Sequence, residues 1–208
     1  MHVIAFGPPG VPQCVQGFLN EEALRIAVDV YDPDNTYNIR THERQQRIIP
    51  GIHFTCTGML TKWIIGAQRI LTQTTNHLQL QIWRRRRQTN NRYDRIDYSD
   101  LTDLNATDDL NVHEYTPNPP LQFQADDLLG LFLPRRTETQ VEAYLQEGGG
   151  PQSYRRSNRN SALSSFSTSG RRVGTDIDMP LVAVEVSGKP YILITKFCML
   201  LHSQINCP

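Results

Sequence analysis

The sequence predicts a mostly β protein, an antiparallel β-sandwich of jelly-roll type with one short helix. Two observations lead to this prediction. Several short segments alternate apolar and polar residues, which is the period of a strand with one buried face. Clusters of proline, glycine, asparagine and aspartate separate these segments and are typical of turns. The clearest alternation is in His77–Trp83, where Leu78, Leu80 and Ile82 fall on one side.

The richest core material lies in the stretch Pro50–Ala67. Alternation from Ile52 to Thr57 predicts a half-buried strand, which Gly58 is expected to break. Leu60–Ile65 predicts a second strand or a bent continuation of the first, with Trp63, Ile65 and Ala67 on one face. We interpret this stretch as core.

The remaining elements follow from local patterns. Asn20 followed by Glu21 and Glu22 is typical of a helix N-cap, so we expect a helix over Glu21–Val28. The run Leu128–Leu133 is almost wholly apolar and predicts a strand buried on both faces, as in the centre of a sandwich. The other expected strands are Asn111–Thr116, Leu121–Gln124, Gln140–Leu145 and Met179–Val186.

The expected domain organisation is one sandwich domain over residues 18–186, after an extended segment over 1–17. Residues 152–174 are rich in serine, asparagine, arginine and glycine and predict a disordered low-complexity loop within that domain. Ser187–Pro190 predicts a turn, so we expect residues 187–208 to be a C-terminal hairpin or, alternatively, a tail outside the domain.

Composition excludes several function classes. The 208 residues carry 21 basic and 21 acidic side chains, so no net charge steers the chain onto nucleic acid. The longest apolar run, Tyr191–Leu201, is too short to span a membrane and is interrupted by Lys196. The N-terminal segment shows no secretion signal, which leaves an intracellular protein or a fragment as alternatives.

Four cysteines, Cys14, Cys56, Cys198 and Cys207, are widely spaced and contain no CxxC pair, so zinc binding has no support. Sequence proximity favours disulfides Cys14–Cys56 and Cys198–Cys207. The alternative is four free thiols, with Cys56 a small core residue. Asn105 begins a glycosylation sequon, Asn-Ala-Thr, in a polar stretch.

The run Arg84, Arg85, Arg86 and Arg87 is the candidate ligand loop, since arginine binds phosphate and sulfated glycans. The alternative is a solvated hairpin loop. Six aspartates in 94–109 could bind calcium or balance the arginines, but their spacing matches no ligand loop, so a solvated loop is favoured there too.

No catalytic, cofactor or metal site emerges from the sequence. Phosphate-binding glycine loops, the G-x-S-x-G elbow and H-E-x-x-H are all absent. Cys56 and His53 are three residues apart and would point to opposite faces of a strand, which argues against a nucleophile and base pair. Glu114 and Asp127 are the carboxylates that a carbohydrate-active enzyme would need.

Three blocks carry a resemblance. In order, they are the stretch from Ile49 through Gly58 to Leu60–Ile64, then Leu78–Trp83, and then Val112–Tyr115 with Phe123–Gly130. They resemble an uncharacterised extracellular β-sandwich module of predicted cell-surface proteins of sponges and other early-branching animals. The resemblance covers about residues 14–186 and transfers no catalytic residues. It implies a secreted or membrane-tethered setting, which favours the disulfides and a glycan on Asn105.

We therefore expect a non-enzymatic recognition or adhesion module, extracellular or tethered to the cell surface, that binds a protein or glycan. The chain departs from the resemblance in having no visible signal peptide or transmembrane helix, which points to a truncated member. The alternative is a cytoplasmic β-sandwich scaffold with reduced cysteines. A carbohydrate-active enzyme on the same sandwich is the third hypothesis. No cofactor and no nucleic acid partner are expected.

Overall fold

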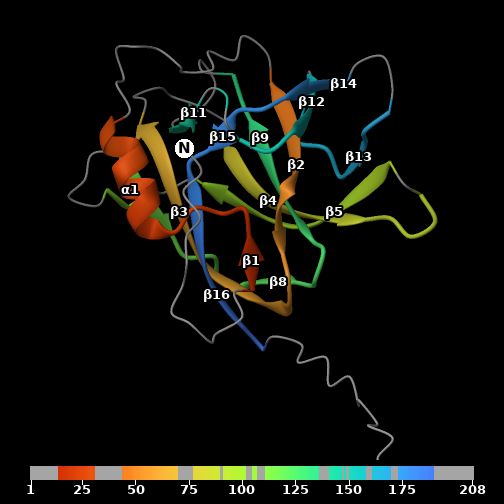
Figure 1. Cartoon of the computed structure of the whole chain (residues 1–208), viewed down its shortest axis with the longest axis horizontal. Coiled ribbons are helices and arrows are strands. Elements are labelled where there is room, and N and C mark those ends of the chain that lie inside the picture. The colour runs from red at the N-terminus through yellow and green to blue at the C-terminus, as the bar shows by residue number, and fades with distance from the viewer. Residues whose placement is uncertain are drawn as a thin grey trace, which may run out of the picture.

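A computed structural model gives the fold (Figure 1). It describes residues 14–30, 44–69, 77–89, 91–101, 105–106, 111–135, 141–146, 148, 150–157, 161–169 and 173–189. The prediction of a mostly β protein with antiparallel strands and one short helix is confirmed for these residues. Cys198, Cys207 and the expected hairpin after residue 189 lie outside the described residues.

The larger sheet has eight strands and curls into half a barrel (Figure 1). Its order is β13-β5-β4-β9-β2-β12-β14, and β1 pairs with β2 outside this path. The bounds are β1 Val15–Gln16, β2 Gln45–Phe54, β4 Leu78–Arg85, β5 Arg92–Leu101, β9 Leu128–Leu133, β12 Ser153–Ser157, β13 Ser165–Ser167 and β14 Val173–Asp176.

The smaller sheet is built around one long strand, β3, Thr57–Arg69. Five shorter strands pair with β3 or with its neighbour: β6 Asn105–Ala106, β7 Val112–Tyr115, β8 Leu121–Phe123, β10 Val141–Ala143 and β16 Val182–Lys189. A separate pair joins β11, Leu145–Gln146, to β15, Met179–Pro180.

One core lies between the two sheets. The inner faces of β2, β4 and β9 pack against that of β3 through apolar side chains that are almost fully buried, among them Phe54, Trp63, Leu80 and Leu131. The predicted face of Trp63, Ile65 and Ala67 belongs to this core, as expected. Burial of this apolar surface is the main force that holds the sheets together.

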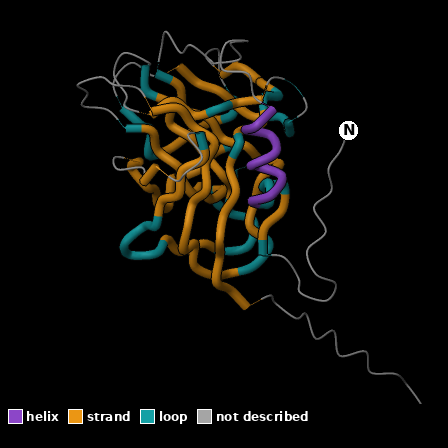
Figure 2. Tube along the Cα trace, turned by 90° about the vertical axis from the view of Figure 1, so that its left-hand side faces the viewer, coloured by secondary structure: helices purple, strands orange, loops and turns teal. Residues whose placement is uncertain are grey.

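The helix α1, Glu21–Val30, covers the outer face of the smaller sheet (Figure 2). The predicted cap is present, since the Ala23 amide donates to Asn20 Oδ1 at 2.6 Å. Leu24 and Val28 pack against that sheet, and Gly66 permits the approach. A Cβ built at Gly66 would lie 2.7 Å from Val28 Cγ2, closer than two carbon atoms can sit.

The larger sheet is covered on its outer face as well, which corrects the prediction of a disordered insert. In the described part of 152–174, the chain forms β12, β13 and the start of β14. Phe166 of β13 packs edge-on against Trp83, with ring centroids 6.3 Å apart. The prediction failed because it rested on the serine-rich composition of the segment. Three apolar residues within it, Leu163, Phe166 and Val173, pack on that face.

Other predictions were wrong at element boundaries. Asp94–Leu101 belongs to strand β5 and is not a loop. The break in the central stretch falls at Thr55–Cys56, so Gly58 lies inside β3. Residues 187–189, expected as a turn, continue β16 along β3.

The prediction for the strand Leu128–Leu133 is confirmed: it is buried along its whole length between β4 and β2.

Candidate functional site

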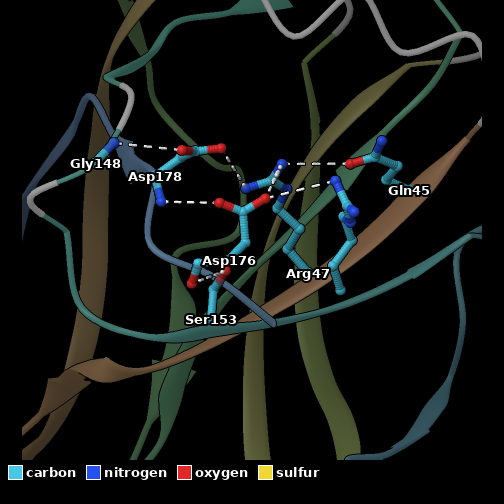
Figure 3. A network of polar contacts seen from close by, with 7 residues as sticks. Gln45, Arg47, Gly148, Ser153, Asp176 and Asp178 are labelled. Carbon is cyan, nitrogen blue, oxygen red and sulfur yellow. Dashed lines mark hydrogen bonds and ion pairs between the residues drawn. The ribbon is translucent and has the colours of Figure 1, made fainter. Parts of the chain in front are cut away.

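The main concentration of buried charge in the described residues surrounds Arg47 on β2 (Figure 3). Its side chain is only 1% exposed. The guanidinium Nη2 lies 3.1 Å from Asp176 Oδ2, and Nη1 lies 3.5 Å from Asp178 Oδ2. Nη2 also donates to Gln45 Oε1 at 3.4 Å. Strand pairing of β12 with both β2 and β14 brings Asp176 beside Arg47.

The two carboxylates also organise the backbone around them (Figure 3). Asp176 Oδ1 accepts a hydrogen bond from the Asp178 amide at 3.0 Å, and Asp178 Oδ1 accepts one from the Gly148 amide at 3.4 Å. Ser153 Oγ donates to the Asp176 carbonyl at 3.2 Å. Arg155 reaches Asp176 from the exposed side, with Nη1 3.6 Å from Oδ2. Two cations therefore face two carboxylates.

The electrostatics of the cluster are dominated by burial. Burial lowers the pKa of Arg47, although Asp176 and Asp178 oppose this shift. Burial also raises the pKa of Asp178, and the hydrogen bond and negative charge of Asp176 raise it further. Burial acts to raise the pKa of Asp176 too, but the hydrogen bond with Asp178 and the charge of Arg47 outweigh it, so that pKa is lowered.

Chemically, this arrangement is a charge balance and not a reactive centre. Arg47 remains protonated under ordinary conditions and cannot act as an acid or base. Its Nε has no hydrogen-bond partner within the described part of the chain, which is a cost that burial of a polar group brings. The described residues hold no group of three or more histidine, cysteine, aspartate or glutamate side chains suited to a metal ion.

The candidate ligand loop, Arg84–Arg87, lies in a β-hairpin, and two of its arginines, Arg84 and Arg86, hydrogen-bond to aspartates. Arg84 Nε and Nη2 donate to the two carboxylate oxygens of the fully buried Asp127 at 2.7 and 2.8 Å. Arg86 makes the same two-pronged contact with Asp94 at 2.9 and 2.6 Å. The hypothesis that aspartates of 94–109 balance these arginines fits the Arg86–Asp94 contact, whereas the partner of Arg84, Asp127, lies outside that segment.

The remaining sequence candidates are Glu114, Asp127 and Asn105, and the two carboxylates pair with different cations. Glu114 pairs with Lys62 at 3.2 Å on the smaller sheet, whereas Asp127 is held by Arg84 on the larger one. Asn105 lies in β6, and the placement of its side chain is not described.

Cys14 and Cys56 form a disulfide, the pairing favoured by sequence proximity. Their Cα atoms are 5.0 Å apart, and the bridge closes a separation of 42 residues. It fixes β1 against the end of β2, where the Thr55 amide also donates to the Cys14 carbonyl at 2.9 Å. Cys56 is therefore not available as a nucleophile.

Sequence reasoning missed the Arg47 cluster entirely. Residues 36–47 are polar, and Gln45, Gln46 and Arg47 contradict the usual pattern of a buried strand. The one available signal is the Asp176-Ile177-Asp178 spacing, which places two carboxylates close together near a strand end. Nothing in the sequence indicates that Arg47 lies beside them.

Comparison of the chain with protein-family models, curated protein sequences and solved structures found no match. No helix in the described ranges has both the length and the apolar character needed to cross a membrane.

Proposed function

We propose that the chain is a non-enzymatic recognition or adhesion module of a secreted or cell-surface protein, on a β-sandwich of jelly-roll type. The Cys14–Cys56 disulfide carries this proposal, because such bonds persist in oxidising compartments. The resemblance to an extracellular module of early-branching animals supports it as well. Its ligand is a protein or a glycan.

The charges of the described site are consistent with a binding role. Arg47, Arg84 and Arg86 each face aspartates, and those contacts fix side chains in place without forming a reactive pair. A rigid sheet that presents fixed side chains and loops is the usual framework for recognition in β-sandwiches.

The test measures the resistance of the disulfide to reduction. The full chain is equilibrated in glutathione buffers at the cytosolic potential, about −280 mV, alkylated and mapped by mass spectrometry. We expect Cys14 and Cys56 to stay linked, since structural disulfides of secreted proteins usually have reduction potentials below that of the cytosolic glutathione pool. Full alkylation of both cysteines would contradict the extracellular proposal and favour an intracellular scaffold with reduced thiols.

A further inference from the structure

On the outer face of the larger sheet, some side chains of the β4–β5 pair remain partly exposed among the described residues. Gln79 lies opposite Asp100, and Gln81 lies opposite Tyr98. Phe166 and Leu163 cover the neighbouring region around Trp83, but Tyr98 remains 41% exposed. An aromatic ring that also carries a hydroxyl therefore stands at the surface beside polar side chains.

These polar side chains are held in place from the core outward. Gln81 is fully buried, and its Oε1 accepts from Gln46 Nε2 at 2.7 Å and from Trp83 Nε1 at 2.8 Å. Gln81 Nε2 then donates to Gln79 Oε1 at 2.7 Å. Gln79 Nε2 donates to Asp100 Oδ1 at 2.7 Å. This row of hydrogen-bonded side chains, from Gln46 through Gln81 and Gln79 to Asp100, fixes the orientation of each amide group and ends at the surface.

Arg95 joins this row to the aromatic ring. Its Nη1 donates to Gln79 Oε1 at 3.0 Å, and its guanidinium carbon lies 4.3 Å from the centroid of Tyr98. Cation–π contact and the hydrogen bond together restrict both side chains. A ligand would then lose little side-chain entropy on binding, because these groups are already ordered.

The polar groups of this face that have no hydrogen-bond partner in the described part of the chain indicate which ligand it could bind. Within the described residues, the Tyr98 hydroxyl, the second oxygen of Asp100 and the Arg95 Nη2 make no hydrogen bond. They offer both donors and acceptors, as sugar hydroxyls require, beside a ring that can pack on the C–H face of a sugar. Arg95 and Asp100 balance each other, so the local charge favours an uncharged ligand over a sulfated one.

We propose that Tyr98, Arg95, Gln79 and Asp100 form a binding site for a neutral oligosaccharide. The inference rests on the proposed recognition role and names its ligand class and surface. It places binding on the sheet face and not on the hairpin arginines, of which Arg84 and Arg86 already contact aspartates.

The experiment is a two-dimensional NMR titration of the full chain with neutral hexasaccharides of glucose, mannose and N-acetylglucosamine, with a heparin hexasaccharide as the acidic comparison. We expect a neutral sugar to shift the side-chain amide signals of Gln79. Tyr98→Ala should weaken binding about tenfold or more, and Tyr98→Phe should weaken it less, because the ring is kept. Ile26→Ala, which removes an exposed apolar side chain on α1, is the matched control and should bind as the original chain does.

Three results would overturn the inference. The first is neutral-sugar binding that Tyr98→Ala leaves unchanged, which would place the site elsewhere. The second is binding of the heparin fragment alone, which would favour the hairpin arginines. The third is no binding of any of these sugars. None of them changes the result of the glutathione equilibration, so failure of this site and failure of the extracellular proposal are separate outcomes.

Discussion

Two arginine–aspartate contacts in this protein differ in the property that decides their energetic weight. Arg86 and Asp94 form the better pair by geometry, with two hydrogen bonds of 2.9 and 2.6 Å, yet their side chains are 45% and 37% exposed. Arg47 has longer contacts of 3.1 and 3.5 Å, but it is 1% exposed. Water can replace a lost partner in the first pair and cannot easily do so in the second.

The comparison teaches that burial, more than contact distance, sets the cost of breaking a pair. A buried cation that loses its counter-charge stays charged in a medium that solvates it poorly. An exposed cation recovers its hydration, and salt already screens its attraction to the partner. Arg84 and Asp127 lie between these limits, since Asp127 is fully buried and Arg84 is 35% exposed.

The largest effect is expected from Asp176→Asn, which removes the nearest counter-charge of Arg47. Removing one partner of a buried pair costs about 3–5 kcal/mol of the free energy of unfolding. Urea denaturation followed by circular dichroism measures the change. A loss as small as that of an exposed pair would show that water already reaches Arg47 and would break the comparison.

A double substitution sharpens this result. Arg47→Met replaces the buried cation with an apolar side chain of similar length, so Asp176→Asn should cost much less in the Arg47→Met background than alone. The difference between the two backgrounds is the coupling energy. Equal costs in both would mean that Asp176 acts through its backbone contacts and not through Arg47.

Asp127→Asn tests the intermediate case. The carboxylate of Asp127 accepts from Arg84 and from the Gln124 amide at 2.8 Å, and an asparagine side chain could keep only part of this set. Hydrogen bonds to charged groups contribute about 1.5–3 kcal/mol, so the loss should fall below that of Asp176→Asn. The same urea experiment gives the ranking, and a larger loss than for Asp176→Asn would reverse it.

The pH dependence of stability separates the two carboxylates of the buried cluster. Because the pKa of Asp178 is raised on folding, its contribution is present at acidic pH and is lost as pH rises through that pKa. Because the pKa of Asp176 is lowered, its contribution is present above the ordinary value of 3.8 and is lost as pH falls below it. The contribution of this cluster to the free energy of unfolding should therefore be largest at a pH between the pKa of Asp176 and the pKa of Asp178.

Urea midpoints measured across this pH range check the expectation. Asp178→Asn should remove the decline that appears as pH rises and leave the decline at low pH. An unchanged decline with rising pH in Asp178→Asn would show that Asp178 does not titrate as the cluster geometry implies.

The fold was more predictable than the site because hydrophobic periodicity reports on faces that meet an apolar core. Leu78, Leu80 and Ile82 alternate and lie in the core, and Asn20 caps the helix as expected. The opposite face of the same strand was harder to interpret. Gln81 and Trp83 are fully buried too. Trp83 packs against Phe166 of β13, which lies about 80 residues further along the chain, and Gln81 hydrogen-bonds to Gln46 and Trp83.

The site depends on pairings that local sequence does not encode. Arg47 lies in a polar stretch, and Asp176 follows the serine-rich segment, so each is ordinary in its own context. Only the register of β12 between β2 and β14 brings them together. Paired cysteines are different, since few pairings exist and proximity along the chain favours Cys14–Cys56.

The smallest effect is expected from Asp94→Asn, at the exposed end of the comparison. The pKa of Asp94 is lowered, mainly by its hydrogen bond with Arg86 and also by that positive charge, so the pair does attract. Exposed pairs nevertheless contribute little, because solvent replaces the partner and the side chains regain freedom. The urea midpoint of Asp94→Asn should lie within error of the original chain, and any small difference should vanish in high salt. A loss that persists in high salt and approaches that of Asp176→Asn would mean that contact geometry, and not burial, decides the strength of these pairs.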